Sequence, residues 1–142
     1  MKRMLASVAL IAVTTSAWAG GALEVSDAWI RHMPADIPSA GYFNLKNEGS
    51  STRYLVGAEC AAFGNTMLHR SVETNGVSRM LHVEAVKVAP GGEVKFAPGG
   101  YHVMFMMPKG SLKLGEQVPV TLKFRNGQQV TARFTVRSPA SE

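Results

Sequence analysis

The chain has 142 residues, of which 46% are hydrophobic and 18% are charged, and its formal net charge at pH 7 is +5. The basic residues are scattered along the chain and form no cluster, which argues against a nucleic-acid partner. Cys60 is the single cysteine, so a disulfide within the chain is excluded and the fold must rest on the packing of its core.

Residues 1–19 have the three parts of a secretory signal peptide. Lys2 and Arg3 are basic, Leu5–Val13 is apolar, and residues 17–19 (Ala-Trp-Ala) have the small-x-small form of a cleavage site. The apolar run is shorter than the roughly 20 residues that span a membrane. We therefore expect a cleaved signal, a periplasmic protein and no membrane span after cleavage; an uncleaved anchor is the alternative.

Cleavage of 19 of the 142 residues leaves 123, a length that suits one domain with one core. We expect this β domain to cover residues 20–137. Residues 138–142 (Ser-Pro-Ala-Ser-Glu) carry no apolar pattern and are expected to form a flexible tail.

Short runs in which apolar and polar residues alternate fill the domain, and this period of two predicts strands. In chain order the runs are Leu23–Arg31, Ala40–Lys46, Thr52–Ala58, Met80–Val88, Gly92–Phe96, Tyr101–Met106, Val118–Arg125 and Gln129–Arg137. Gly, Pro and Asn turn signals separate them. About eight short strands at this spacing predict an all-β fold, a Greek-key β-sandwich or barrel.

The clearest hairpin joins the last two strands through Asn126-Gly127. Both central residues of a type I′ turn need positive φ, which Asn and Gly tolerate. We expect a turn of that type here. In the second strand Val130, Phe134 and Val136 share one face, as is typical of a half-buried strand.

Histidine and methionine occur together in the domain. Three histidines lie two residues from a methionine, in Met67-Leu68-His69, Met80-Leu81-His82 and His102-Val103-Met104, and the fourth, His32, is beside Met33. Residues i and i+2 of a strand share a face, so His102 and Met104 should project together while Val103 and Phe105 enter the core. The same holds for Met80 and His82, with Leu81 and Val83 inward. For Met67 and His69 a strand and a loop are both compatible with the polar stretch that follows.

Imidazole and thioether form a soft, neutral ligand set, which favours Cu(I) over Mg²⁺ or Ca²⁺. The chain offers fewer of the ligands that zinc prefers, because it has one cysteine and no CxxC or HxxxH spacing. A single strand methionine is usually core filler, and a single histidine is usually a surface residue. Their joint occurrence is what predicts a copper site.

The same residues resemble the periplasmic copper A chaperone family, written PCu(A)C, whose pattern is His, ten residues, Met, twenty-one residues, His, one residue, Met. Ten residues separate His69 from Met80, twenty-one separate Met80 from His102, and Met104 follows one residue after His102. The resemblance extends over most of the domain, through residues 28–31 (Ala-Trp-Ile-Arg), 40–43 (Ala-Gly-Tyr-Phe) and 98–104.

The resemblance implies a cupredoxin-like β-barrel that binds one Cu(I) per chain through His69, Met80, His102 and Met104. It also implies a chaperone, not an enzyme, that delivers copper to the copper-bearing subunit of cytochrome c oxidase, whose dinuclear centre it helps to assemble, alongside a Sco-type thiol protein. Many family members have Met directly after the first His, where this chain has Arg70. Met67 and His82 are therefore additional candidate donors.

Three alternatives remain open at this point. A blue-copper electron carrier would need Cys60 as its thiolate, far in sequence from His102. A β-sandwich that binds a partner without metal would not depend on the histidines at all. A periplasmic protein that buffers copper for tolerance would use the same ligands as a chaperone.

Overall fold

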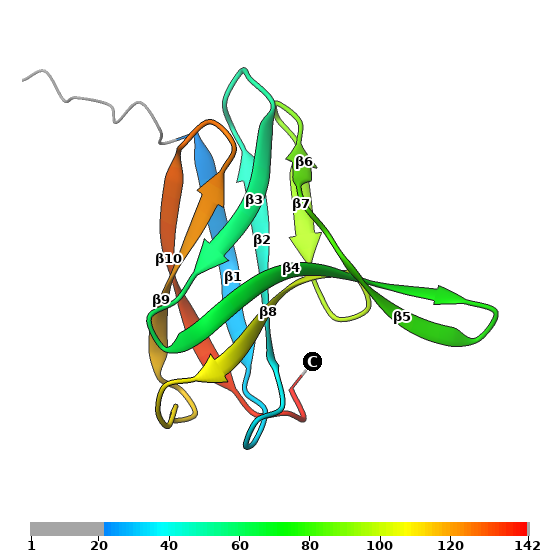
Figure 1. Cartoon of the computed structure of the whole chain (residues 1–142). Coiled ribbons are helices and arrows are strands. Elements are labelled where there is room, and N and C mark those ends of the chain that lie inside the picture. Colours follow the sequence, from blue (N-terminus) through cyan, green and yellow to red (C-terminus); the bar gives the residue numbers. More distant parts are fainter. Residues whose placement is uncertain (1–21, 142) are drawn as a thin grey trace, which may run out of the picture.

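Figure 1 shows the computed structural model of the chain, which describes residues 22–141. The proposed signal peptide, residues 1–19, lies outside the described residues. No helix in residues 22–141 has the length and apolar character needed to cross a membrane. The described residues form ten strands: β1 Leu23–Arg31, β2 Ser39–Asn47, β3 Arg53–Glu59, β4 Phe63–Thr74, β5 Val77–His82, β6 Val86–Val88, β7 Glu93–Phe96, β8 Tyr101–Pro108, β9 Gln117–Phe124 and β10 Gln129–Arg137.

The ten strands make one sheet in the order β5-β4-β8-β7-β2-β1-β10-β9-β3-β6, with a further pairing between β8 and β2. Only β1–β10 and β7–β8 pair in parallel among the described strands. Every strand except β5 contributes to a single cluster of buried apolar side chains. The sheet is therefore wrapped around one core, and the predicted all-β Greek-key architecture is confirmed.

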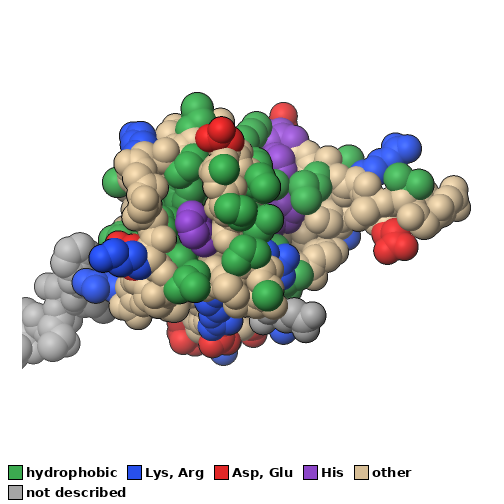
Figure 2. Space-filling view, turned by 90° about the horizontal axis from the view of Figure 1, so that it is seen from below, with side chains coloured by type: hydrophobic (Ala, Val, Ile, Leu, Met, Phe, Trp, Pro, Cys, Tyr) green, Lys and Arg blue, Asp and Glu red, His purple; other side chains and the backbone are tan. Residues whose placement is uncertain are grey.

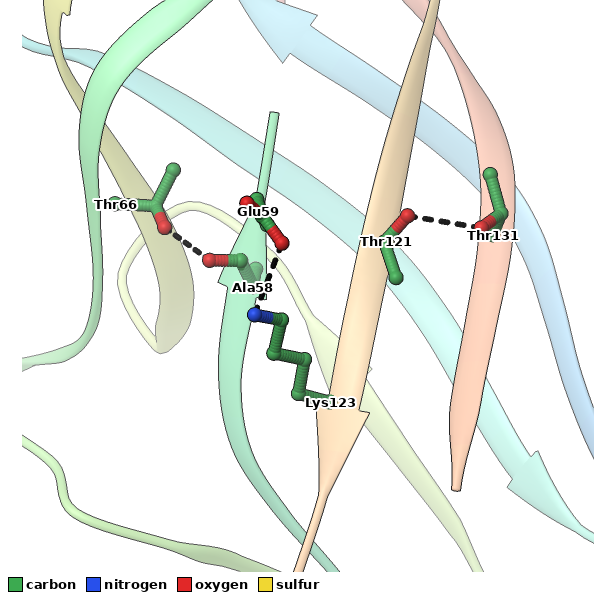
Figure 3. A network of polar contacts seen from close by, with 6 residues as sticks. All are labelled: Ala58, Glu59, Thr66, Thr121, Lys123 and Thr131. Carbon is green, nitrogen blue, oxygen red and sulfur yellow. Dashed lines mark hydrogen bonds and ion pairs between the residues drawn. The ribbon is translucent and has the colours of Figure 1, made fainter. Parts of the chain in front are cut away.

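One side-chain contact joins two strands that are not neighbours in the sheet. The Thr66 hydroxyl of β4 donates a hydrogen bond to the Ala58 carbonyl oxygen of β3, although β3 and β4 are not neighbours in the sheet order (Figure 3). Close by, the Lys123 ammonium of β9 lies 2.9 Å from the Glu59 carboxylate. The link from β4 to β3 helps to close the sheet beside the strand pair that carries the histidines.

Two features of the strand prediction were wrong. Residues 80–88, predicted as one strand, belong to β5 and β6, which lie at opposite ends of the sheet order. Strand β4 was absent from the predicted set. Its outer half pairs with β5 in a hairpin that projects away from the body of the molecule (Figure 1). Because this hairpin buries neither face, its sequence lacks the alternation that marks the other strands.

The predicted type I′ turn at Asn126-Gly127 is wrong, and a turn of that kind occurs at Asn75-Gly76. At Asn75-Gly76 both residues have positive φ, 51° and 76°, as a type I′ turn requires. At Asn126-Gly127 only Gly127 does, with φ 87°, and its N–H donates to the Phe124 carbonyl oxygen at 3.0 Å. The second turn is therefore a tight turn followed by a left-handed glycine, a three-residue arrangement also common in hairpins.

Strand β5 lies outside the core. All six of its residues are exposed, and Leu81, which was expected to point inward, has 48% of its surface exposed. Val83, just after the strand, is partly buried and packs against the core as expected. The chain therefore returns to the body of the molecule only after His82.

Candidate metal centre

The register of β4, β5 and β8 places all the predicted donors on one face of the sheet. His69 lies opposite His102, and Met67 lies opposite Met104, across the β4–β8 pair. His82 lies opposite His69 across the β4–β5 pair. Directly paired residues share a face, as do residues two apart in one strand. Met80, two residues before His82, therefore belongs to this face as well.

Three imidazoles form a row across these strands. The His69 and His102 ring centroids are 5.7 Å apart, and those of His69 and His82 are 6.1 Å apart, with the rings nearly perpendicular in both pairs. Figure 2 shows histidines gathered beside apolar side chains where the hairpin leaves the body of the molecule. Residues that are distant in the sequence thus meet at the root of the hairpin.

His102 is positioned as a metal ligand would be. Its side chain is only 3% exposed, and its Nδ1 lies 3.3 Å from the Gly100 carbonyl oxygen. A proton on Nδ1 satisfies that contact and leaves the lone pair on Nε2 free. Nε2 is buried without a hydrogen-bond partner, and so is Nδ1 of His69. Buried polar atoms without partners are costly, and a metal ion is one kind of partner that an imidazole nitrogen takes.

Burial also keeps these imidazoles neutral. Desolvation is the main cause that lowers the pKa of His102. The hydrogen bond to Gly100 raises this pKa in part, and the charge of the neighbouring His69 lowers it further. The pKa of His69 is lowered by desolvation and by the nearby His82. A neutral imidazole keeps the lone pair that a metal needs.

This lowered pKa gives a prediction for the metal-free protein. An unfolded histidine titrates near pH 6.5, so below that pH the unfolded chain binds more protons than the folded one, and the free energy of unfolding should fall as the pH drops. Urea denaturation at pH 7.5 and 5.5 measures this fall. It should be smaller in His102→Gln, which removes one titrating group, and an equal fall in parent and variant would contradict the prediction.

A groove of about 450 Å³ adjoins these strands, and three of the four predicted ligands line it: Met80, His102 and Met104. His69 lies outside the groove lining and reaches the site through its ring contact with His102. Met67 is outside it too. Met104 is 9% exposed, whereas Met80, on the projecting hairpin, is 61% exposed. The site therefore has a buried side on β8 and an open side on β5.

A wall of aromatic and arginine side chains stands beside the site and was not predicted from the sequence. The Tyr42 ring centroid lies 6.4 Å from that of His102 and 4.8 Å from that of Trp29. The Arg31 guanidinium stacks over both aromatic rings, at 5.4 and 5.6 Å. Desolvation raises the pKa of Tyr42, so its phenol stays protonated. The spacing of Trp29 and Arg31, two residues apart in a predicted strand, is the signal that could have indicated that they share a face.

The donor set available to a metal combines imidazole nitrogen with thioether sulfur. Within residues 22–141 no three His, Cys, Asp or Glu side chains are grouped so that they could hold a metal ion. The described residues that line the groove include no carboxylate, and their one formal charge is the cation of Arg31. A metal bound here would have to combine imidazole with thioether ligands.

Cys60 does not belong to this site. It is buried and free, and it lines a separate pocket with Phe63, Thr121 and Lys109. Desolvation raises the pKa of its thiol, whereas a copper ligand must be a thiolate. The geometry therefore gives no support to a blue-copper centre.

The fold is that of a PCuAC domain. The copper-bound PCuAC domain from PmoF2 superposes with a TM-score of 0.71 at 23% identity, covering 86% of this chain and 97% of that one. CuI-DR1885 from Deinococcus radiodurans superposes with a TM-score of 0.67 at 29% identity, covering 89% and 85%. The cupredoxin-like fold and the resemblance to PCu(A)C proteins are thereby confirmed.

The chain belongs to the family described as "Putative lipoprotein LpqE-like", which it matches over residues 23–136. Within curated proteins it is 34% identical over 106 residues to the "Putative lipoprotein Lxx21020" of Leifsonia xyli subsp. xyli. That match covers 74% of this chain and 63% of the relative. The chain thus spans less than two thirds of that protein.

Proposed function

We propose that this protein binds one Cu(I) ion per chain through His69, Met80, His102 and Met104, and that it is a periplasmic copper chaperone, a carrier and not an enzyme. One observation carries the proposal. Two unpartnered ring nitrogens, on His69 and His102, lie on the same sheet face as the thioethers of Met80 and Met104.

The charge of the site supports Cu(I) over divalent ions. The methionine ligands carry no charge, and the histidine ligands carry none when their imidazoles are neutral. The groove lining includes the cation of Arg31 and no carboxylate that would balance the charge of a bound metal ion. An uncompensated charge in a partly buried site is costly, and more so for a divalent ion than for a monovalent one. Thioether sulfur also selects soft ions. CuI-DR1885, at 29% identity, supports the same metal.

The two sides of the site suit a carrier. His102 and Met104 are nearly buried, and Met80 is mostly exposed on a hairpin that packs against little else. A recipient can therefore displace Met80 first while the buried pair still holds copper. This stepwise exchange of ligands lets the ion leave without passing through a free state.

For location and destination the support comes from the sequence and the family. A signal-like segment at residues 1–19 and the lipoprotein description of the family support export to the periplasm. The PCu(A)C resemblance supports delivery to the copper-bearing subunit of cytochrome c oxidase, with a Sco-type thiol protein as a further partner. Met67 and His82 are secondary donors in this proposal.

The test is an anaerobic titration of the purified protein with Cu(I) against a colorimetric Cu(I) chelator. We expect one equivalent to be retained, and the same equivalent in the control Met107→Leu, whose methionine is 63% exposed. If the parent protein retains no Cu(I), the copper proposal is wrong and a metal-free binding module becomes the better account.

A second measurement separates delivery from buffering. The Cu(I)-loaded protein is mixed with the apo form of the soluble copper-bearing domain of the oxidase subunit, and the copper content of each is measured after separation. Transfer supports the chaperone role. Retention by the donor, at equal concentrations, would indicate buffering.

A further inference from the structure

Met33 lies at the proposed copper site although it is distant from all four proposed ligands in the sequence. It belongs to the segment between β1 and β2, and it lines the same groove as Met80, His102 and Met104. Its side chain is half-buried. The structure therefore brings a third methionine to the groove, from a part of the chain outside the spacing pattern that runs from His69 to Met104.

The backbone of Met33 is held in place. Its N–H donates a hydrogen bond to the Ser39 hydroxyl at 3.0 Å, and Ser39 is only 2% exposed. Ala40, the residue after Ser39, lies directly opposite Met104 in the β2–β8 pair. Ala40, Met104 and Met33 all line the groove, and the small side chain of Ala40 fills little of it.

The other groove residues supply no alternative soft donor. Beyond the proposed ligands, the polar side chains there are a guanidinium, a phenol and a hydroxyl, from Arg31, Tyr42 and Ser71. Of these, the guanidinium is a cation and has no lone pair to offer. The phenol and the hydroxyl are hard oxygen donors that Cu(I) does not favour. Met67, an additional candidate donor from the sequence, pairs with Met104 but does not line the groove.

We propose that Met33 is a further Cu(I) ligand of this site. The proposal rests on the copper function proposed above and extends its ligand set. With Met33 included, thioethers reach the ion from three separate segments: the β1–β2 connection, the β5 hairpin and β8. Because His69, Met80, His102 and Met104 already make a full ligand set for Cu(I), Met33 binds by taking the place of one of them, and it holds the ion while the exposed Met80 is exchanged.

The residue-specific test is NMR of the protein labelled with ¹³C at the methionine methyl groups, with and without one equivalent of Cu(I), which is diamagnetic. Substitutions of single methionines by Leu assign the signals. The Met33 methyl signal should shift together with those of Met80 and Met104, while that of Met107 stays in place. A stationary Met33 signal, or a shift of Met67 in its place, would overturn the proposal.

Affinity gives an independent readout. The substitution Met33→Leu nearly conserves the side-chain volume. It should lower the Cu(I) affinity about tenfold, which is the smallest loss expected when a group that supports a metal site is removed. Met107→Leu is the matched control. An unchanged affinity in Met33→Leu, with the parent still binding one equivalent, overturns the role of Met33 alone. Failure of the parent to bind overturns the copper function itself.

Discussion

Replacing Met104 by Leu is expected to lower the Cu(I) affinity by at least about 100-fold while the domain stays folded. Loss of a residue that only supports a metal ligand costs about 10–100-fold, so loss of a ligand itself should cost no less. Met104 is 9% exposed and lies on β8, two residues after His102. Leu fills nearly the same volume but has no sulfur to donate.

The measurement is the competition titration described above, combined with urea denaturation of the metal-free protein. Met107→Leu, three residues further along the chain, removes a sulfur outside the groove and should match the parent in both assays. Equal Cu(I) affinities for Met104→Leu and the parent would exclude Met104 as a ligand. A large loss of stability in the variant would mean that Met104 acts through packing.

The second large effect is on stability. Phe105→Ala is expected to lower the free energy of unfolding by about 3–5 kcal/mol, the usual range for truncating a fully buried phenylalanine. The Phe105 side chain is fully buried, and its ring centroid lies 5.0 Å from that of Phe63. A Cβ added at Gly41 would lie 2.5 Å from the Phe105 ring. The packing is therefore close, and removal of the ring leaves a cavity.

Urea denaturation of the metal-free variant measures this effect, with Leu114→Ala as the control. Leu114 is 64% exposed, and substitutions at such surface positions usually change stability by less than about 0.5 kcal/mol. Phe105 also lies on the strand that carries His102 and Met104. A variant as stable as the parent would show that the core around β8 can repack, against the geometry described above.

The sequence by itself predicted much of the sheet because burial on one face imposes a period of two. The bounds Leu23–Arg31 and Gln129–Arg137 agree with β1 and β10. Both strands carry core side chains such as Ile30 and Phe134. The period of two also placed His102 beside Met104 on one face of β8. In β4, whose core residues Phe63 and Leu68 are five positions apart, and in the exposed hairpin beyond them, the period of two is absent and the prediction failed.

The arrangement of the site depended on register, which no local pattern specifies. The spacing of His69, Met80, His102 and Met104 selected the candidate ligands. That His69 lies opposite His102 follows from how β4 and β8 pair. A shift by one residue would move His69 to the other face. The packing of the buried residues of β4 and β8 therefore decides where the proposed metal site lies.

The sequence alone determined the all-β class, most strand positions and the His and Met residues that predict copper chemistry, because each depends on residue type and short-range periodicity. Only the tertiary structure decided that Leu81 faces solvent, that Cys60 lies in a different pocket, and that Met33 joins Met80 and Met104. These features depend on contacts between strands that are distant in the chain. Such contacts are fixed by the packing of the whole core.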